Sequence, residues 1–185
     1  MLSIEIKRPI EKDLDNLNLF FRVVIEDTFE REGIAHLVDD IESEIIEKQK
    51  YLKLDLDSNR ENRYFLLAII NNQIIGTIEY GPVSKLISDL TNGELQDLVE
   101  VGTVFVRPDY QGKGIGTLLW NAMYLTLQSK GIDEFCLDSG YSNAQKIWKK
   151  KFGKPDYLIK DYWSEGNDHM IWRRKARNNP IIFKL

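Results

Sequence analysis

Apolar residues follow two different periods along the chain, and these periods divide it into helices and strands. Alternation of apolar and polar residues predicts a first strand over residues 2–6. Apolar residues then recur at helical spacing over residues 14–31 and 37–52, with Gly33 between the two stretches. The polar run at 55–62 predicts a loop. The first third of the chain is therefore predicted to form one strand and two amphipathic helices.

Strand patterns dominate the middle of the chain. Residues 64–70 and 74–80 are apolar and rich in isoleucine, and the Asn-Asn-Gln sequence between them predicts a hairpin because asparagine tolerates positive φ. Gly76 inside the second of these strands indicates a bulge. Residues 84–93 fit either a loop or a helical turn packed over a cleft. We expect residues 95–106 to form a fourth strand that pairs with the third.

The last third of the chain returns to alternating helix and strand signals. The pattern predicts a helix at 117–130, a strand at 135–138, a helix at 144–152 capped by Ser142 and Asn143, and strands at 157–163 and 170–174. A strand, a helix and a second strand in succession indicate a parallel pair of strands.

The segment from residue 101 to residue 119 changes character twice and carries the clearest chemical signal. Residues 101–106 read as a buried strand, and Pro108 marks a turn. Three glycines, Gly112, Gly114 and Gly116, then precede an amphipathic helix. The first amides of a helix have no partner within the helix, and glycine lets an anion approach them closely. The segment is therefore predicted to bind a pyrophosphate group.

Two common phosphate-binding motifs do not fit this segment. A Walker motif requires a lysine directly after its last glycine, whereas Gly116 is followed by Thr117. The dinucleotide motif requires a third glycine at position 117. A nucleotide- or NAD-binding domain is therefore the weaker alternative.

The spacing Gln111-Gly112-Lys113-Gly114-Ile115-Gly116, after a strand that ends in Val106-Arg107-Pro108, closely resembles the coenzyme A signature of the GNAT superfamily of acyl-CoA N-acyltransferases. This resemblance implies an α/β (α+β) fold with a mixed central sheet of about six to seven strands, flanked by about four helices. The predicted order of elements agrees with that fold. We expect a single domain over residues 1–175, followed by a C-terminal tail at 176–185.

The resemblance also implies how coenzyme A is bound. The pantetheine arm would lie between the strands at 101–106 and 135–138, and the pyrophosphate would lie on the glycine-rich turn, with Lys113 adding positive charge. The implied coenzyme-binding residues in this part of the chain are Val104, Phe105, Val106, Gln111, Gly112, Lys113, Gly114, Ile115, Gly116 and Thr117.

Acetylation of an amine requires a base for the amine proton and an acid for the departing thiolate. Glu100 is the candidate base. The alternative is that Glu100 is a strand-edge glutamate that faces water and has no catalytic role. The family commonly has a tyrosine five positions after its Asn, and this tyrosine acts as the acid. This chain has Trp148 at that position, so Tyr141 is the candidate acid instead. The alternative is that Tyr141 is a loop aromatic packed on the core. Trp148 would line the pantetheine channel, and Asn143 would bind the pantetheine amide, cap a helix, or do both.

Composition narrows the class of protein further. The net charge of −4 gives no basic surface for nucleic acid, and no apolar run is long enough to span a membrane. A single cysteine, Cys136, excludes an intrachain disulfide and favours a cytoplasmic setting, and its apolar neighbours favour a structural thiol. His36 and His169 lack ligand spacing, so no metal is expected, although His169 is a weak candidate for the border of the acceptor pocket.

These observations predict an enzyme with two small partners. We expect acetyl-CoA as co-substrate and a primary amine of a small molecule or peptide as acceptor, in a monomer or homodimer. The alternative is a non-catalytic acyl-CoA sensor on the same fold, which the tryptophan at position 148 favours.

Overall fold

The computed structural model describes residues 3–58 and 61–181. These residues divide into two compact units, and each is described by itself. The first unit contains the described residues up to 80, together with 103–126 and 180–181. The second unit contains residues 81–102 and 127–179.

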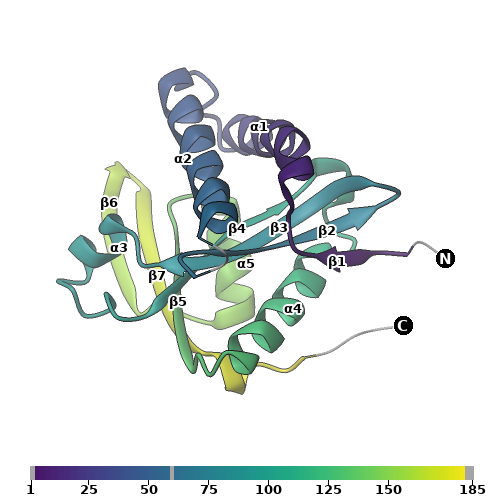
Figure 1. Ribbon diagram of the computed structural model, residues 1–185. Helices are drawn as coiled ribbons and strands as arrows, with labels where there is room; N and C mark the ends of the chain where they lie inside the picture. Colours follow the sequence, from purple (N-terminus) through teal and green to yellow (C-terminus); the bar gives the residue numbers. More distant parts are fainter. Residues whose placement is uncertain (1–2, 59–60, 182–185) are drawn as a thin grey trace. The chain divides into compact units, whose positions relative to one another are not determined.

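The first unit has a sheet with helices on both faces. Figure 1 shows α1 and α2 on one face of strands β1, β2 and β3, and α4 on the other. Strand β2 pairs with both β1 and β3 in antiparallel fashion. The elements that lie wholly or mostly in this unit are β1 (Glu5–Lys7), η1 (Glu11–Asp13), α1 (Leu14–Arg31), α2 (Val38–Asp57), β2 (Tyr64–Ile70), β3 (Gln73–Pro82), η2 (Pro108–Tyr110) and α4 (Ile115–Ser129).

Packing on both faces explains why β2 and β3 are apolar almost throughout. On the face covered by α1, the ring of Phe21 lies 6.4 Å from Phe65 and 6.3 Å from Phe105. On the face covered by α4, a Cβ at Gly76 would lie 2.9 Å from the Leu119 side chain, so only glycine fits there. The register of β2 and β3 shifts beside Gly76, which confirms the predicted bulge.

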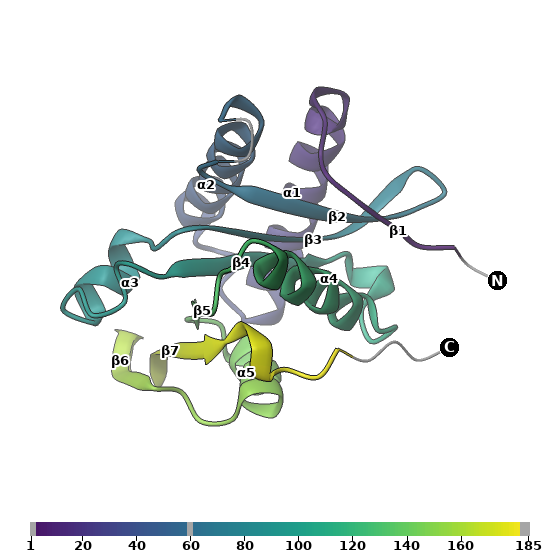
Figure 2. The same ribbon diagram turned by 60° about the horizontal axis from the view of Figure 1, so that its bottom comes forward.

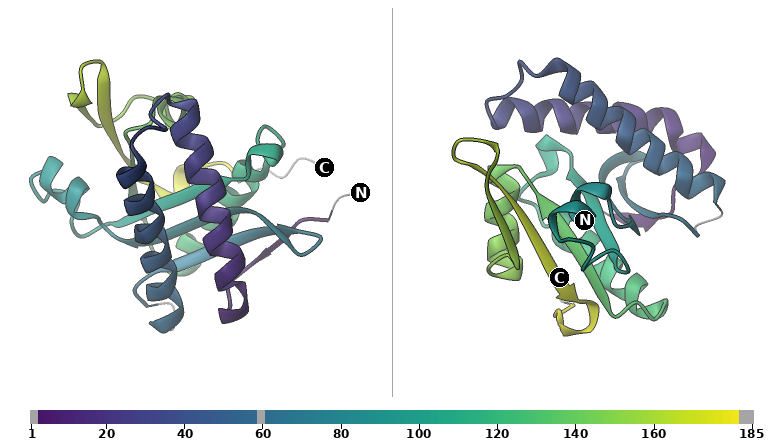
Figure 3. Two further views of the ribbon diagram at one scale, coloured as in Figure 1. Left: turned by 90° about the horizontal axis from the view of Figure 1, so that it is seen from above. Right: turned by 90° about the vertical axis from the view of Figure 1, so that its left-hand side faces the viewer.

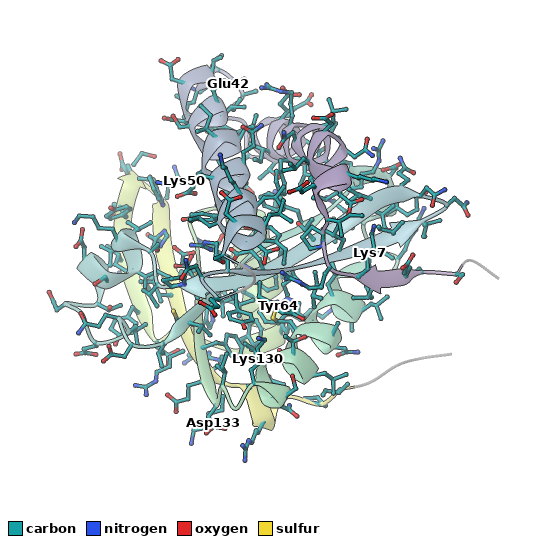
Figure 4. All side chains as sticks on the ribbon, viewed as in Figure 1. Lys7, Glu42, Lys50, Tyr64, Lys130 and Asp133 are labelled. Carbon is teal, nitrogen blue, oxygen red and sulfur yellow. The ribbon has the colours of Figure 1, made fainter. Side chains whose placement is uncertain are left out.

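Helices α1 and α2 lie side by side across these strands (Figure 3, left). Figure 4 labels Glu42 on α2, whose carboxylate accepts two hydrogen bonds from the Arg22 guanidinium of α1, at 2.6 and 2.9 Å. Both side chains are partly exposed, so this pair fixes the register of the two helices more than it stabilises them.

The second unit is built on the parallel pair that the sequence predicted. Strand β5 pairs in parallel with β4 and antiparallel with β7, which in turn pairs with β6. Figure 2 shows α5 beside β7. The elements of this unit are α3 (Lys85–Leu90), the first half of β4 (Val99–Val106), β5 (Glu134–Ser139), α5 (Ser142–Phe152), β6 (Tyr157–Ser164), β7 (Asn167–Lys175) and η3 (Ala176–Asn178).

Strand β4 contributes to both units, and the hydrogen-bonded strand order is β1-β2-β3-β4-β5-β7-β6. The described residues form seven strands and five α-helices, of which α3 has only six residues. The predicted α/β class with a mixed sheet is therefore confirmed. No helix in the described ranges is long and apolar enough to cross a membrane.

Most predicted elements are confirmed, but several boundaries were wrong: β1 spans Glu5–Lys7 rather than residues 2–6, and α4 begins at Ile115 rather than at residue 117. Strand β4 begins at Val99 rather than at residue 95, because consecutive tight turns occupy residues 91–98 around Gly93. Helix α2 continues to Asp57, because Asp55 is buried and forms an ion pair with Arg8. Helix α5 already includes Ser142 and Asn143, so neither residue is the N-cap.

Parts of three predictions lie outside the described residues: residue 2 of the first strand, residues 59–60 of the predicted loop and residues 182–185 of the tail. The described start of the tail is ordered. The backbone N–H of Ala176 donates to the carbonyl of Asp133 at 2.8 Å, and the Ala176 side chain is buried. The single domain over 1–175 remains a prediction.

Candidate functional site

The glycine-rich turn of the first unit is open at its surface. Gly112 and Gly114 have φ values of 73° and 84°, and a Cβ built on either would have no atom within 4 Å. These glycines are therefore required by backbone conformation rather than by crowding. The first helical bond runs from Leu118 N–H to the Gly114 carbonyl, so the amides just before it, including Gly116 N–H, belong to the first turn of α4. An anion can be bound there.

Side chains around this turn hold it in place. The Gln111 amide group donates to the carbonyl of Val106 at 3.1 Å and accepts from Arg31 at 2.9 Å. Lys113, a predicted coenzyme-binding residue, donates a hydrogen bond to the carbonyl of Asp109 at 2.8 Å. Its ammonium group therefore lies on the turn. Arg31 comes from the end of α1, and no sequence motif pointed to it. It adds an exposed cation beside the turn.

The predicted pantetheine-binding residues of β4 follow a strained position. Thr103 has a φ of 48°, which is unusual for a β-branched residue. Its carbonyl accepts a hydrogen bond from the Thr77 hydroxyl at 2.8 Å, and its own hydroxyl donates to Glu79 at 3.2 Å. Directly after it, Val104, Phe105 and Val106 are half-buried. Strand β3 thus fixes the backbone at the start of this segment.

Glu79 belongs to a buried charge cluster that sequence reasoning missed. It is 1% exposed and forms an ion pair of 2.8 Å with Arg63, which is 5% exposed. The Arg63 guanidinium lies 3.4 Å from the centre of the Tyr51 ring. Burial raises the pKa of Glu79, and Arg63 opposes this shift. The Arg63 guanidinium and the Thr103 hydroxyl together satisfy this carboxylate inside the protein.

In the second unit, the candidate base Glu100 shares a sheet face with other chemically active side chains. Its carboxylate accepts a hydrogen bond from the backbone N–H of Ser84 at 2.7 Å. Glu100 is in register with Cys136, and Asp138 is two residues further along β5, so all three side chains lie on one face. Burial, with smaller contributions from Glu100 and Asp138, raises the pKa of the Cys136 thiol. Cys136 is therefore a protonated, structural thiol.

On the same face, Asp138 is linked to a tryptophan through His169. The His169 ring is 2% exposed; its Nε2 lies 3.0 Å from Asp138 Oδ2, and its Nδ1 lies 3.2 Å from Trp163 Nε1. The sequence had marked His169 only as a weak candidate beside an acceptor pocket. Neither Asp138 nor Trp163 carried a recognisable signal, because three different strands supply the three residues.

The remaining candidates lie around the start of α5. Tyr141 is the N-cap residue, and its backbone N–H donates to the Ser139 hydroxyl at 3.1 Å. Asn143 is exposed in the first turn and accepts from Lys146 at 3.4 Å. The half-buried Trp148 ring lies 6.0 Å from the ring of Phe152, on one side of the helix. The roles of these three residues remain predictions.

Across residues 3–58 and 61–181, no group of three or more histidine, cysteine, aspartate or glutamate side chains is arranged to hold a metal ion.

Comparison with known proteins agrees with this combination of fold and turn. The model of the Acetyltransferase (GNAT) family matches residues 25–153, which is most of the chain. The chain belongs to this family.

Individual relatives are more distant. The [ribosomal protein bS18]-alanine N-acetyltransferase of Haemophilus influenzae is 30% identical over 102 residues, which is 53% of this chain and 60% of that protein. The match thus spans less than two thirds of the relative's length.

Solved structures of similar proteins share the fold. The PaiA N-acetyltransferase of Thermoplasma acidophilum, in complex with coenzyme A, has a TM-score of 0.67 and 24% identity, covering 94% of this chain and 99% of that one. A ribosomal-protein-alanine N-acetyltransferase of Brucella melitensis has a TM-score of 0.65 and 19% identity, covering 92% and 99%.

Proposed function

We propose that this protein transfers an acetyl group from acetyl-CoA to a primary amine of a small molecule or peptide. The observation that carries the proposal is the open glycine turn at the start of α4, within a chain that belongs to the acetyltransferase family. The coenzyme A bound in the structure of the Thermoplasma relative supports the choice of co-substrate.

The turn and the end of β4 would hold the coenzyme. The pyrophosphate would accept hydrogen bonds from the first amides of α4, where the helix dipole also favours negative charge. Arg31, which also forms an ion pair of 2.8 Å with Asp27, would add a charge-assisted contact, and its partner Gln111 would keep the turn in shape. Residues 104–106 would pair with the pantetheine arm, as the family resemblance implies.

Chemistry would proceed by direct attack of the amine. The amine nitrogen forms a bond to the thioester carbon, the carbon–sulfur bond breaks, and the thiolate leaves as coenzyme A. Glu100 would take the proton that the amine loses, and Tyr141 would protonate the thiolate. Ser84 N–H holds the Glu100 carboxylate in place, which favours a positioned base over a mobile surface residue.

The names of similar proteins suggest acceptors to try first. Two of them are alanine N-acetyltransferases of ribosomal proteins according to their names, and an aminoglycoside 6′-acetyltransferase shares the fold at 14% identity. A first panel of acceptors would therefore contain an alanine-initiated peptide, an aminoglycoside and simple alkylamines.

Calorimetry with acetyl-CoA tests the role of the turn. Gly116→Glu would place a carboxylate at the predicted pyrophosphate position, and the fold should tolerate it because a Cβ there lies 3.9 Å from Val106. We expect binding to be lost in this variant. Leu125→Glu adds the same charge on the exposed side of α4 and should bind normally. Unchanged affinity in folded Gly116→Glu would refute the assignment.

A turnover assay separates an enzyme from a sensor. Release of the coenzyme A thiol would be followed for each amine in the panel, at a saturating concentration of acetyl-CoA. We expect acetylation of at least one amine. Tight acetyl-CoA binding without turnover on any amine would favour the non-catalytic sensor, which the tryptophan at position 148 had suggested.

A further inference from the structure

Trp163 is an exposed tryptophan held in a fixed position. Its side chain is 56% exposed, although its indole N–H donates to buried His169. A Cβ at Gly140 would overlap with the indole nitrogen, so the ring packs directly on the backbone there. The ring of Tyr162, also exposed, meets it edge to face at 4.9 Å. Exposed and preorganised aromatic rings are typical of binding sites, because little side-chain entropy remains to be lost.

An irregularity in β6 presents these two rings. The register of β6 and β7 is interrupted between Ile159 and Ser164, and Asp161 has a φ of 53°. Hydrogen bonds hold the distorted backbone: Asp161 N–H donates to Asp168 at 3.0 Å, and Gly166 N–H donates to Asp161 at 2.6 Å. The hairpin, seen from two further directions in Figure 3, is thus fixed locally rather than loose.

The hydrogen bonds of His169 place a neutral imidazole beside Asp138. An indole N–H can only donate, so Nδ1 of His169 must accept and carries no proton. Nε2 therefore carries the single proton of a neutral imidazole, and its N–H donates a hydrogen bond to Asp138. Across the described ranges, Asp138 forms no ion pair with a lysine or arginine. The Asp138 side chain is 23% exposed, so a cationic ligand can reach its carboxylate.

The neighbouring charges have the same sign. The hairpin residues 157–169 contain Asp161, Glu165 and Asp168 against one cation, Lys160. Aromatic faces attract cations as well, and tryptophan does so most strongly. The site therefore combines a charged carboxylate, two aromatic faces and an acidic surrounding.

From these features we propose that Asp138, Trp163 and Tyr162 form the recognition site for the acceptor amine, and that the acceptor arrives as an alkylammonium ion. The proposal rests on the proposed function and specifies its acceptor. Asp138 would accept hydrogen bonds from the ammonium group, and the two rings would contact the adjoining carbon chain. Glu100 lies on the same sheet face, where the bound amine would lose its proton.

The indole N–H signal of Trp163 in a ¹⁵N NMR spectrum reports binding without turnover. The chain has four tryptophans, and the signal is assigned by its loss in Trp163→Phe. The probes are n-butylammonium against n-butanol, and the amide of tri-alanine against its N-acetylated form. We expect both cations to shift the signal saturably and both neutral partners to leave it almost unchanged.

Two matched variants then test the role of Asp138. Asp138→Asn should weaken binding of the cationic probes about 10- to 100-fold, the value of a hydrogen bond to a charged group. Glu165→Gln removes the same charge from the exposed turn of the hairpin and should change binding only slightly.

Several outcomes would overturn the proposal: equal shifts with n-butanol, equal effects of the two variants, or no saturable shift with either cation. Its failure can be told apart from failure of the proposed function. If wild type acetylates an amine with the same KM as Asp138→Asn, only the recognition site is wrong. If the cations bind but acetyl-CoA is never turned over, the enzymatic function is wrong.

Discussion

Glu79 in the first unit and Asp138 in the second each lie in a network of neighbours, and the two networks differ in charge. In the first unit, Glu79 is fully buried against the guanidinium of Arg63. In the second unit, Asp138 is partly exposed and meets a histidine that Trp163 keeps neutral. The first cluster is compensated internally, so its role is to hold the folded structure, including the start of the 104–106 segment. In the described ranges the second carboxylate pairs with no lysine or arginine and is partly exposed, so a cationic ligand can reach it.

The largest effect is expected from breaking the compensated pair. Arg63→Met leaves Glu79 without its cation and should lower the free energy of unfolding by about 3–5 kcal/mol. Burial raises the pKa of Glu79 in the folded state. Glu79 therefore stabilises the fold fully at pH values below its unfolded pKa of about 4.3. This contribution is lost as the pH rises through the pKa of Glu79 in the folded state. The loss should therefore grow with pH, as urea denaturation at several pH values would reveal.

A rescue variant controls this experiment. Adding Glu79→Gln to Arg63→Met removes the buried charge and should restore stability at the higher pH values. If the double variant is as unstable as the single one at every pH, the cost comes from lost packing around Tyr51 rather than from charge.

A smaller effect is expected where Trp163 packs on the backbone. Gly140→Ala would push the indole ring away and should cost about 1–3 kcal/mol through overpacking. The same change should abolish the amine-induced shift of the Trp163 signal. Gly116→Ala, where the added Cβ meets only an ordinary contact, is the matched control. Full stability and normal amine binding in Gly140→Ala would mean that the ring position is unimportant.

Cys136 provides a test of which groups on the shared sheet face are chemically active. Its thiol is buried and its pKa is raised, so it should not attack the thioester. Cys136→Ala should retain turnover and lose about 1–2 kcal/mol of stability. Loss of turnover in a stable variant, with an acetylated cysteine detected by mass spectrometry in wild type, would contradict this.

The smallest stability change is expected at the uncompensated carboxylate. Asp138→Asn keeps the shape of the side chain and should cost about 1 kcal/mol or less, because Asp138 stays partly hydrated. Thermal denaturation of the Asp138→Asn and Arg63→Met variants would compare the loss of stability in the two units. Equal losses would mean that both clusters serve the fold.

The two kinds of site also differ in how well the sequence predicted them. The glycine turn was predicted because backbone amides need glycines at fixed spacing, and that spacing is visible along the chain. Asp138, His169 and Trp163 meet only through the register of β5, β7 and an irregular β6, which no local pattern encodes. Arg63 and Glu79 are 16 residues apart and become neighbours only in the folded sheet. The predicted base Glu100 lies on a strand as expected, but its contact with Ser84 N–H was not predictable.

The pH dependence of acetyl transfer tests most directly the claim that carboxylates of the second unit act on the amine. Single-turnover rates would be measured across pH for wild type and Glu100→Gln, with an amine that wild type acetylates. We predict that the rate in wild type rises with pH as base and amine lose protons. Glu100→Gln should bind acetyl-CoA normally but transfer acetyl about 10²- to 10⁴-fold more slowly. Two curves that coincide in height and shape would contradict the account.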